Sequence, residues 1–455
     1  MPGRVKSRWV IVALLPLIAA VGCGGDAGDG ESSTPAESAS SSEVAAPTSP
    51  PLPPSTGSPD PTPPPPASTP TPPSTPTPTP PSTPTPDLMA EAVEPEPTLT
   101  GPELQAIVED ALETPAGTVA LADRMVELQV AGAAVVIVVD GEVLTSFAAG
   151  MTPSGRPMTT STLSQVGSVS KTVAALTAAT LASGGVIEWD GEVGSVLASY
   201  ELPASTDATP PSVTFGQLLS HTAATSVSGF LGYESVEDVP DLLGILRGEG
   251  NSAPVEIIGE PGAGFLYSGG GYQVAELAML DATGAASWDE LVRRQVLDPL
   301  EMADSFYALA LTDEQAARAT EGSLQGLALP DRWQVHPEGA AAGLWTTADD
   351  LGRLLLAIGA ALRGDQTALP SAEVRRMMLP VAEALGGAVG TGVFLDSGTE
   401  PTRWSHGGRN IGYQSLLAGS ADGRFGLAII TNSIPGGEQL IVDIERTVST
   451  ALGWS

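Results

Sequence analysis

The sequence contains one cysteine, Cys23, and three histidines, His221, His336 and His406. A single cysteine excludes an intramolecular disulfide. A chain without cysteine clusters or an H-E-x-x-H pattern also gives little support for a zinc site. We therefore expect no metal site, and the motifs described below imply no organic cofactor.

Basic residues are also scarce. The chain has 19 lysines and arginines against 53 acidic residues, which gives a formal net charge of −34. An acidic surface of this kind repels nucleic-acid phosphates, so we expect no nucleic-acid partner. Lysine is the rarest cation, because it occurs only at Lys6 and Lys171 and every other basic residue is arginine.

The N-terminal segment over residues 1–22 predicts an export signal. Arg4, Lys6 and Arg8 precede an apolar run over residues 9–21. This run is short for a membrane span, and a charged start followed by a short apolar run is typical of a signal peptide.

Cys23 stands at the end of that apolar run, after small residues. The arrangement resembles the bacterial lipobox, whose cysteine is acylated, although Ala20 departs from the leucine that the pattern prefers. The resemblance implies a lipoprotein signal peptide and a lipid on Cys23. The lipid would anchor the exported protein to a bacterial membrane in the cell envelope, with the folded domain on the extracytoplasmic side. Cleavage after Gly22 without lipidation is the alternative.

Residues 23–98 are rich in Pro, Ser and Thr and contain the near-repeat STPTPPSTPTPTPPSTPTP. Such a composition cannot bury enough apolar surface to fold, so it predicts a disordered linker. Because proline favours the extended polyproline II conformation, we interpret the segment as a stalk that holds the domain away from a membrane. A passive linker of no required length is the alternative.

Residues 99–455 predict one domain of the α+β class. Its pattern indicates an antiparallel β-sheet flanked by helices and built from both chain ends, with a mostly helical subdomain inserted between them. The expected elements are a helix over 104–130, a hairpin at Asp140-Gly141, a helix from Ser168 to Gly184-Gly185, a mostly helical region over 186–390 whose clearest helix is capped by Thr346 or Thr347, a hairpin at Asp422-Gly423 and a helix over 437–452.

Ser168 and Lys171 lie three residues apart at the start of an apolar helix, which places both side chains on one face. A serine hydroxyl needs a base to become a nucleophile, and a lysine amine can serve if burial lowers its pKa. Arginine stays protonated and cannot do this. The spacing alone is weak evidence, because a serine falls three residues before a given lysine by chance about one time in ten. The pair is less expected in a domain that has no other lysine.

Five ordered segments of the domain resemble the serine β-lactamase-like superfamily, which includes class C β-lactamases, penicillin-binding-protein-related esterases and D-amino-acid peptidases. The segments are QVGSVSKTVAAL around Ser168, LLSHTAA, FLYSGGGY around Tyr267, PEGAAAGLWTTADDL, and WSHGGRNIGY around His406. The resemblance covers nearly all of residues 100–455 and implies a β-lactamase/transpeptidase-like fold.

The resemblance implies catalytic roles for three residues. Ser168 stands at the position of the nucleophile, Lys171 at that of its base, and Tyr267 at that of the Y-x-N tyrosine, which shares proton transfer. His406, Gly407 and Gly408 stand where the family has K-T-G, on a strand that substrate approaches closely. The resemblance also implies that the backbone N–H groups of Ser168 and Arg409 form the oxyanion hole.

Two positions depart from the family pattern. The asparagine of Y-x-N is Gly269, and the lysine of K-T-G is His406. The lysine is a permanent cation that could hold a substrate carboxylate, as β-lactams and D-Ala-D-Ala present. Since this cation is missing, we expect an esterase or D-peptidase rather than an efficient β-lactamase.

Other residues have plainer interpretations. We expect His221 to be structural, with a hydrogen bond to nearby backbone, and His336 to lie in a loop. Trp345 and Trp404 are expected in the core or the cleft wall. Without the resemblance, Tyr267 would be taken for a half-buried aromatic at a glycine-rich turn, and His406 would be equally consistent with a site and with a plain strand edge.

The sequence therefore predicts an exported, membrane-tethered serine hydrolase that forms an acyl-enzyme on Ser168. Its partners would be a small ester, amide or peptide substrate and the membrane. A non-catalytic cell-envelope ligand-binding protein with the same fold is the alternative, and Gly269 is the residue that favours it. A cell-wall peptidase differs from the first interpretation only in substrate.

Overall fold

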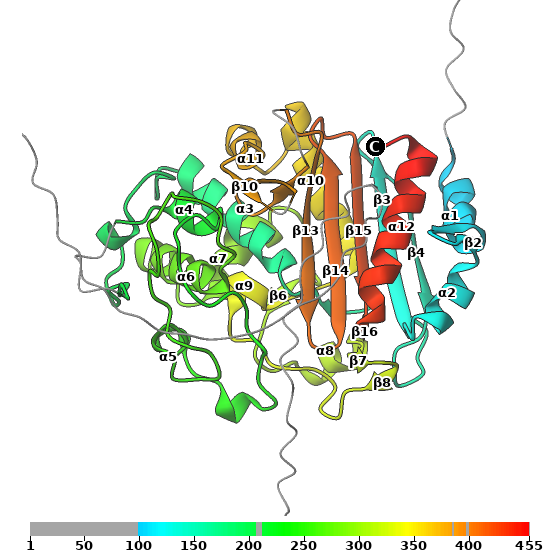
Figure 1. Ribbon diagram of the computed structural model, residues 1–455, viewed down its shortest axis with the longest axis horizontal. Coiled ribbons are helices and arrows are strands. Elements are labelled where there is room, and N and C mark those ends of the chain that lie inside the picture. Colours follow the sequence, from blue (N-terminus) through cyan, green and yellow to red (C-terminus); the bar gives the residue numbers. More distant parts are fainter. Residues whose placement is uncertain (1–98, 206–211, 385, 397–399, 455) are drawn as a thin grey trace, which may run out of the picture. The chain divides into compact units, whose positions relative to one another are not determined.

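The computed structural model describes residues 99–455 except 206–211, 385, 397–399 and 455. Figure 1 shows how the elements of this part are arranged. The predicted signal peptide over 1–22, the predicted linker over 23–98 and Cys23 lie outside the described residues, so these remain predictions.

An antiparallel sheet joins the two ends of the domain. Its eight strands have the order β10-β11-β12-β13-β14-β15-β3-β4. The register of β15 on β3 places Ile429 opposite Val135, so the C-terminal strands continue directly into the N-terminal hairpin. The strands are β3 (Gly132–Val139), β4 (Glu142–Gly150), β10 (Ala382–Ala384), β11 (Gly387–Val389), β12 (Phe394–Leu395), β13 (Arg403–Asn410), β14 (Tyr413–Ser420) and β15 (Phe425–Thr431).

Both predicted hairpins are confirmed. Asp140 and Gly141 join β3 to β4 with φ values of 50° and 87°, and two successive positive φ values are what a type I′ turn requires. Between β14 and β15, Gly423 has a φ of 75°, and the Asp422 carboxylate accepts a hydrogen bond from the Arg424 amide at 3.0 Å.

Each face of the sheet is covered by its own core. Along β3, Ala134, Val136 and Val138 face one core, while Ala133, Val135 and Ile137 face the other, because successive strand residues point to opposite faces. Helices α10 (Ala348–Arg363) and α3 (Val169–Ser183) cover the first face, and α12 (Gly436–Leu452) and α1 (Gly101–Asp110) cover the second. In Figure 1, α12 lies in front of the sheet and α10 behind it.

The region between the two halves of the sheet is mostly helical, as predicted, and it also supplies β10 and β11. The fold prediction is thereby confirmed: an α+β domain with an antiparallel sheet from both chain ends and an inserted helical subdomain. Its helices are α4 (Phe215–Leu219), α5 (Leu242–Arg247), α6 (Gly269–Thr283), α7 (Trp288–Val292), α8 (Asp313–Arg318), α9 (Gly339–Ala342) and α11 (Ser371–Met377). Short strands β5 (Ser164–Gln165), β6 (Phe306–Tyr307) and β9 (Leu344–Thr346) form one small sheet, and β7 (Ser323–Leu324), β8 (Leu327–Ala328) and β16 (Ser433–Ile434) form another.

The prediction of one helix over 104–130 is wrong. The segment contains α1, a small hairpin of β1 (Leu112–Thr114) and β2 (Gly117–Val119), and α2 (Leu121–Glu127). Pro115 has no N–H to donate in a helix interior, and Gly117 has a φ of 123°. The buried apolar residues of the segment face one core, so their spacing imitated a continuous helix; they are Leu104, Val108, Leu112, Leu121, Met125 and Val130.

Three other helix predictions are confirmed. α3 begins directly after Ser168, α10 is capped by the Thr347 side chain, which accepts from the Asp350 amide, and α12 closes the domain. Among the described residues, no helix is both long enough and apolar enough to cross a membrane.

Candidate active site

Ser168 lies at a sharp turn between β5 and α3. Gly167, directly before it, has a φ of 50°, a conformation that glycine adopts without strain. The Ser170 side chain pins this turn, because its hydroxyl donates to the Gly167 carbonyl at 2.6 Å and accepts from the Leu344 amide at 3.1 Å. Ser168 itself keeps part of its surface exposed.

Lys171 is buried beneath Ser168. Only 2% of its surface is exposed, since α3 buries twelve of its fifteen residues. The Lys171 amine lies 3.0 Å from the Ser168 Oγ and donates to the Ala341 carbonyl at 2.8 Å. No acidic side chain in the described part of the chain forms an ion pair with it. Burial without a counter-charge lowers the pKa of Lys171 to about 7.

Tyr267 lies over the same pair. The Lys171 amine is 5.1 Å from the centre of its ring, and the ring packs against His221 with 4.2 Å between ring centres. Burial raises the pKa of Tyr267 to about 12, and a hydrogen bond with the Ser168 hydroxyl opposes this rise. Tyr267 therefore stays protonated at neutral pH and can donate a proton within the site.

His406 completes the group from β13. It is 2% exposed, and its ring centre lies 6.4 Å from that of Tyr267. Burial, and next the charge of Lys171, lower the pKa of His406 to about 3. The imidazole is therefore neutral at physiological pH. The structure thus brings Tyr267 and His406, which the sequence places far from Ser168, together with Ser168 and Lys171.

The edge of β13 beyond His406 is open. Strand β12 pairs only with Trp404 and Ser405, so within the described residues no strand pairs with this edge from His406 to Arg409. Gly407 is exposed. Gly408 faces inward, where a Cβ would meet the Val166 carbonyl oxygen at 1.9 Å. Only glycine permits this approach of β13 to the turn before Ser168.

The turn at Gly167 packs directly against the backbone of Arg409. A Cβ added to Gly167 would lie 2.5 Å from the Arg409 amide nitrogen. The chain at Gly167-Ser168 and the amide of Arg409 are therefore close neighbours. The oxyanion hole that the resemblance implies requires such proximity of the Ser168 and Arg409 backbones.

Gly269 stands at the position of the Y-x-N asparagine, and neighbouring residues lie close to the space where a side chain would begin. A Cβ at Gly269 would lie 3.0 Å from the Phe230 ring and 3.3 Å from the Ser228 carbonyl oxygen. The space that an asparagine side chain would enter is thus bounded by the Phe230 ring.

Several residues of the site were not singled out from the sequence. The Tyr272 ring centre lies 5.5 Å from the Lys171 amine, and the Tyr272 hydroxyl donates to the Leu219 carbonyl. Phe394 packs against both Tyr267 and His406. The only sequence signal for either residue is an aromatic side chain in or near a segment that resembles the family.

The plainer predictions for the remaining residues hold. The Ser268 amide donates to His221 Nδ1 at 3.0 Å, which confirms a structural backbone contact, although the His221 ring also packs against Tyr267. His336 lies in the loop before α9, as predicted, but is buried. Trp345 and Trp404 are both buried in the core.

Helix α9 links the site to a buried carboxyl group. At its start, the Ala340 amide donates to Glu276 at 2.8 Å. At its end, the Ala341 carbonyl accepts from Lys171 and the Ala342 carbonyl accepts from Asn410. Burial raises the pKa of Glu276 to about 8, so this carboxyl is mostly neutral at pH 7.

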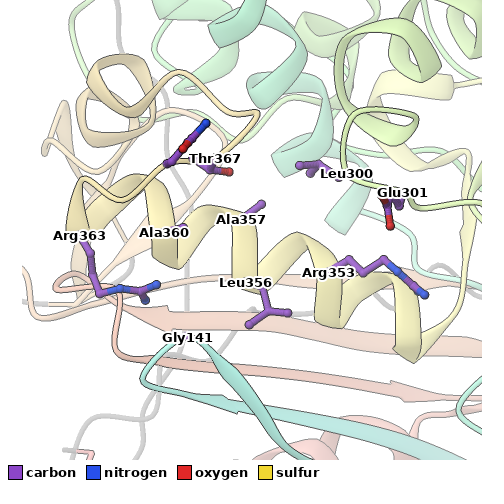
Figure 2. Close-up of a pocket in the computed structure, with 10 residues that line it drawn as sticks. Gly141, Leu300, Glu301, Arg353, Leu356, Ala357, Ala360, Arg363 and Thr367 are labelled. Atoms are coloured by element: carbon purple, nitrogen blue, oxygen red, sulfur yellow. The ribbon is translucent and has the colours of Figure 1, made fainter.

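A separate hollow of about 360 Å³ lies beside α10. Figure 2 shows Arg353 and Arg363 near opposite ends of the helix that lines it. Arg353 pairs with Asp350 and Arg363 with Asp365. The hollow contains none of the predicted site residues, so we assign no function to it. Among the described residues, no group of three or more His, Cys, Asp or Glu side chains is placed to hold a metal ion.

Replacing Gly167 tests the contact with Arg409. G167A would strain a positive φ and drive a Cβ into the Arg409 backbone, whereas G185A strains a φ of 69° with no atom within 4 Å. We expect G185A to lower the free energy of unfolding by about 1 kcal/mol and G167A to lower it further. Urea unfolding of both variants measures this, and equal losses would contradict the close contact.

Replacing Glu276 tests its burial. Its pKa of about 8 in the folded state exceeds the value of about 4.3 in an unfolded chain. The folded state therefore holds a proton that the unfolded state lacks between these values, and stability falls as pH rises through them. Relative to E276Q, the wild type should lose thermal stability from pH 5 to pH 8. E188Q at an exposed position is the control, and parallel curves for wild type and E276Q would contradict the shift.

Comparison with known proteins agrees with this geometry. The family model described as Beta-lactamase matches residues 104–452. Esterase EstB of Burkholderia gladioli is 30% identical over 273 residues, which cover 51% of this chain and 67% of the esterase.

Solved structures share the fold. The octameric penicillin-binding protein homologue from Pyrococcus abyssi aligns with a TM-score of 0.60 and 20% identity, over 73% of this chain and 76% of that one. EstCE1, described as a hydrolase with promiscuous acyltransferase activity, aligns with a TM-score of 0.57 and 19% identity, over 72% of this chain and 98% of that one. The chain therefore belongs to the β-lactamase family and is a serine hydrolase of the β-lactamase-related type.

Proposed function

We propose that the protein cleaves small esters, amides or D-amino-acid peptides through an acyl-enzyme on Ser168, with Lys171 as the base. The observation that carries the proposal is the 3.0 Å contact between the Lys171 amine and the Ser168 Oγ. The amine has a pKa of about 7, so a substantial fraction is neutral at physiological pH. A neutral amine at this distance can accept the hydroxyl proton.

Acylation follows from these contacts. Neutral Lys171 takes the Ser168 proton as the Oγ attacks the substrate carbonyl carbon, and the carbonyl electron pair moves onto its oxygen. That oxyanion accepts hydrogen bonds from the backbone N–H groups of Ser168 and Arg409, which stabilise it by a few kcal/mol each. When the oxyanion collapses, the bond to the leaving group breaks. Tyr267 protonates the leaving group, and the proton held by Lys171 restores the tyrosine.

Deacylation reverses the roles with water as the nucleophile. Water loses a proton to the restored base and attacks the acyl carbon, and the Ser168 Oγ leaves with a proton. The residues required are the same three. No metal ion or organic cofactor takes part in these steps.

The neutral His406 bears on the choice of substrate. In β-lactams the carboxylate lies on the leaving-group side of the scissile bond, where Tyr267 and His406 stand. An imidazole whose pKa is about 3 offers no charge to that carboxylate. Similarity to an esterase supports ester substrates, and D-amino-acid amides or peptides remain within the same chemistry. A cell-wall peptidase would differ only in the substrate.

A non-catalytic ligand-binding protein is the second candidate. The observation that favours it is Gly269, which leaves the site without the side-chain amide of Y-x-N. The three reactive side chains are nevertheless in contact around Ser168, and a binding protein has no need of an amine with a lowered pKa there.

We also propose that the protein is exported and tethered to a bacterial membrane through a lipid on Cys23. The support is the order of features in the sequence: a basic start, an apolar run and the only cysteine, followed by a proline-rich segment. The domain would then act on the extracytoplasmic side, in the cell envelope.

Serine-directed labelling tests the catalytic proposal. A fluorophosphonate probe should label the wild type and fail to label S168A. K171R retains a permanent charge and cannot accept the proton, so its labelling rate should fall by about 100-fold or more. Intact-mass measurement detects the adduct. A folded wild type that accepts no serine-directed probe would favour the ligand-binding protein instead.

Metabolic labelling tests the lipid anchor. In cells that export the full chain, radiolabelled palmitate should enter the wild type and not C23A. The wild type should also sediment with membranes, while C23A appears in the soluble fraction. A wild type that incorporates no palmitate would reject lipidation and leave ordinary cleavage after Gly22.

A further inference from the structure

Arg409 is unlike the other arginines of the domain. Within the described residues, fourteen of the fifteen arginines form an ion pair or a side-chain hydrogen bond, and Arg409 forms neither. The region over 99–455 carries 43 acidic residues, so partners are abundant. An exposed cation without a partner in so acidic a domain requires an explanation.

Arg409 stands beside the reacting centre. It follows Gly408 on the open edge of β13, and its amide touches the turn before Ser168. Its side chain is on the same strand face as Gly407, because alternate residues share a face. Gly407 adds no side chain there, and a Cβ at this position would have only one atom within 4 Å. The strand face next to Arg409 is therefore open at Gly407, and Arg409 itself is exposed.

The acid on the same face is engaged elsewhere. Arg409 lies opposite Gln414 in the register of β13 on β14, and the Gln414 side chain donates to Glu438 at 3.2 Å. Glu438 forms no ion pair with Arg409. Within the described residues, the guanidinium therefore has no protein acceptor, and its donors are open to a ligand.

The direction of the strand decides which part of the substrate meets Arg409. The leaving group departs toward Tyr267 and His406. Tyr267 donates a proton to it, and His406 lines that side of the site. Arg409 lies three residues further along β13, on the other side of the oxyanion position. A substrate whose carbonyl oxygen is held by the Ser168 and Arg409 amides has its acyl chain at this end of the open edge. The Arg409 side chain begins on the strand face opposite to His406 and Gly408, so its guanidinium meets the acyl chain by reaching around the edge.

We propose that the Arg409 guanidinium binds a carboxylate on the acyl group of the substrate, so that monoesters or monoamides of dicarboxylic acids are preferred over neutral acyl esters. The proposal rests on the function proposed above. It differs from the lysine of K-T-G, because it places the substrate carboxylate on the acyl side and not on the leaving-group side. A planar guanidinium suits this task, since it binds a carboxylate through two parallel hydrogen bonds.

A matched pair of substrates tests the proposal. The p-nitrophenyl monoester of glutaric acid and p-nitrophenyl pentanoate have acyl chains of equal length and differ in the terminal carboxylate. We expect the ratio of kcat/KM for the charged ester to that for the neutral ester to fall about tenfold in R409Q, through KM, since a charge-assisted hydrogen bond is worth about that factor. R409K should retain part of the ratio.

Two controls make the result specific. R424Q removes the same charge from the turn between β14 and β15, where Arg424 pairs with Asp140, and should leave the ratio unchanged. The ratio for 4-acetoxybenzoate against phenyl acetate, which carry the difference on the leaving group, should also stay unchanged in R409Q. An unchanged glutarate ratio in R409Q, or an equal change in R424Q, would overturn the proposal. Loss of turnover of p-nitrophenyl pentanoate in S168A tests the hydrolase function separately.

Discussion

The burial of the Lys171 amine without an acidic partner is the constraint on which the rest of the site depends. An amine in water is charged at neutral pH, and only the loss of its hydration brings the pKa down to about 7. Helix α3 is buried along most of its length, and the Tyr267 and Tyr272 rings lie 5.1 and 5.5 Å from the amine. The Ala341 carbonyl supplies a hydrogen bond without a negative charge, so it holds the amine and leaves its pKa low.

The close approach of the β13 backbone to the turn before Ser168 then determines which residues lie next to Ser168. α3 comes from the N-terminal half of the chain and β13 from the C-terminal half, and they meet where neither Gly167 nor Gly408 carries a Cβ. Because β15 pairs with β3, the sheet fixes the distance between these halves. The basic residues of the site differ in environment: the buried Lys171 has a pKa of about 7, the buried His406 has a pKa of about 3, and Arg409 lies at the exposed edge.

The sequence predicts those features that depend on local spacing. Ser168 and Lys171 share a helix face because they are three residues apart, and Asp-Gly dipeptides mark both hairpins. It fails over 104–130, where apolar residues in a helix, a hairpin and a second helix face one core with a helix-like spacing. It is silent on the Ala341 carbonyl, Glu276 and Phe230, because a backbone acceptor and contacts between residues far apart in the sequence leave no local pattern.

The charge of Lys171 can be observed directly, because lysine occurs only twice in the chain. In the full-length K6R variant labelled with ¹³C- and ¹⁵N-lysine, a single side-chain resonance reports this amine. We predict that its chemical shift titrates with a midpoint near pH 7, and that the midpoint survives in S168A. A midpoint near 10.4, the value of a solvated lysine, would contradict the account.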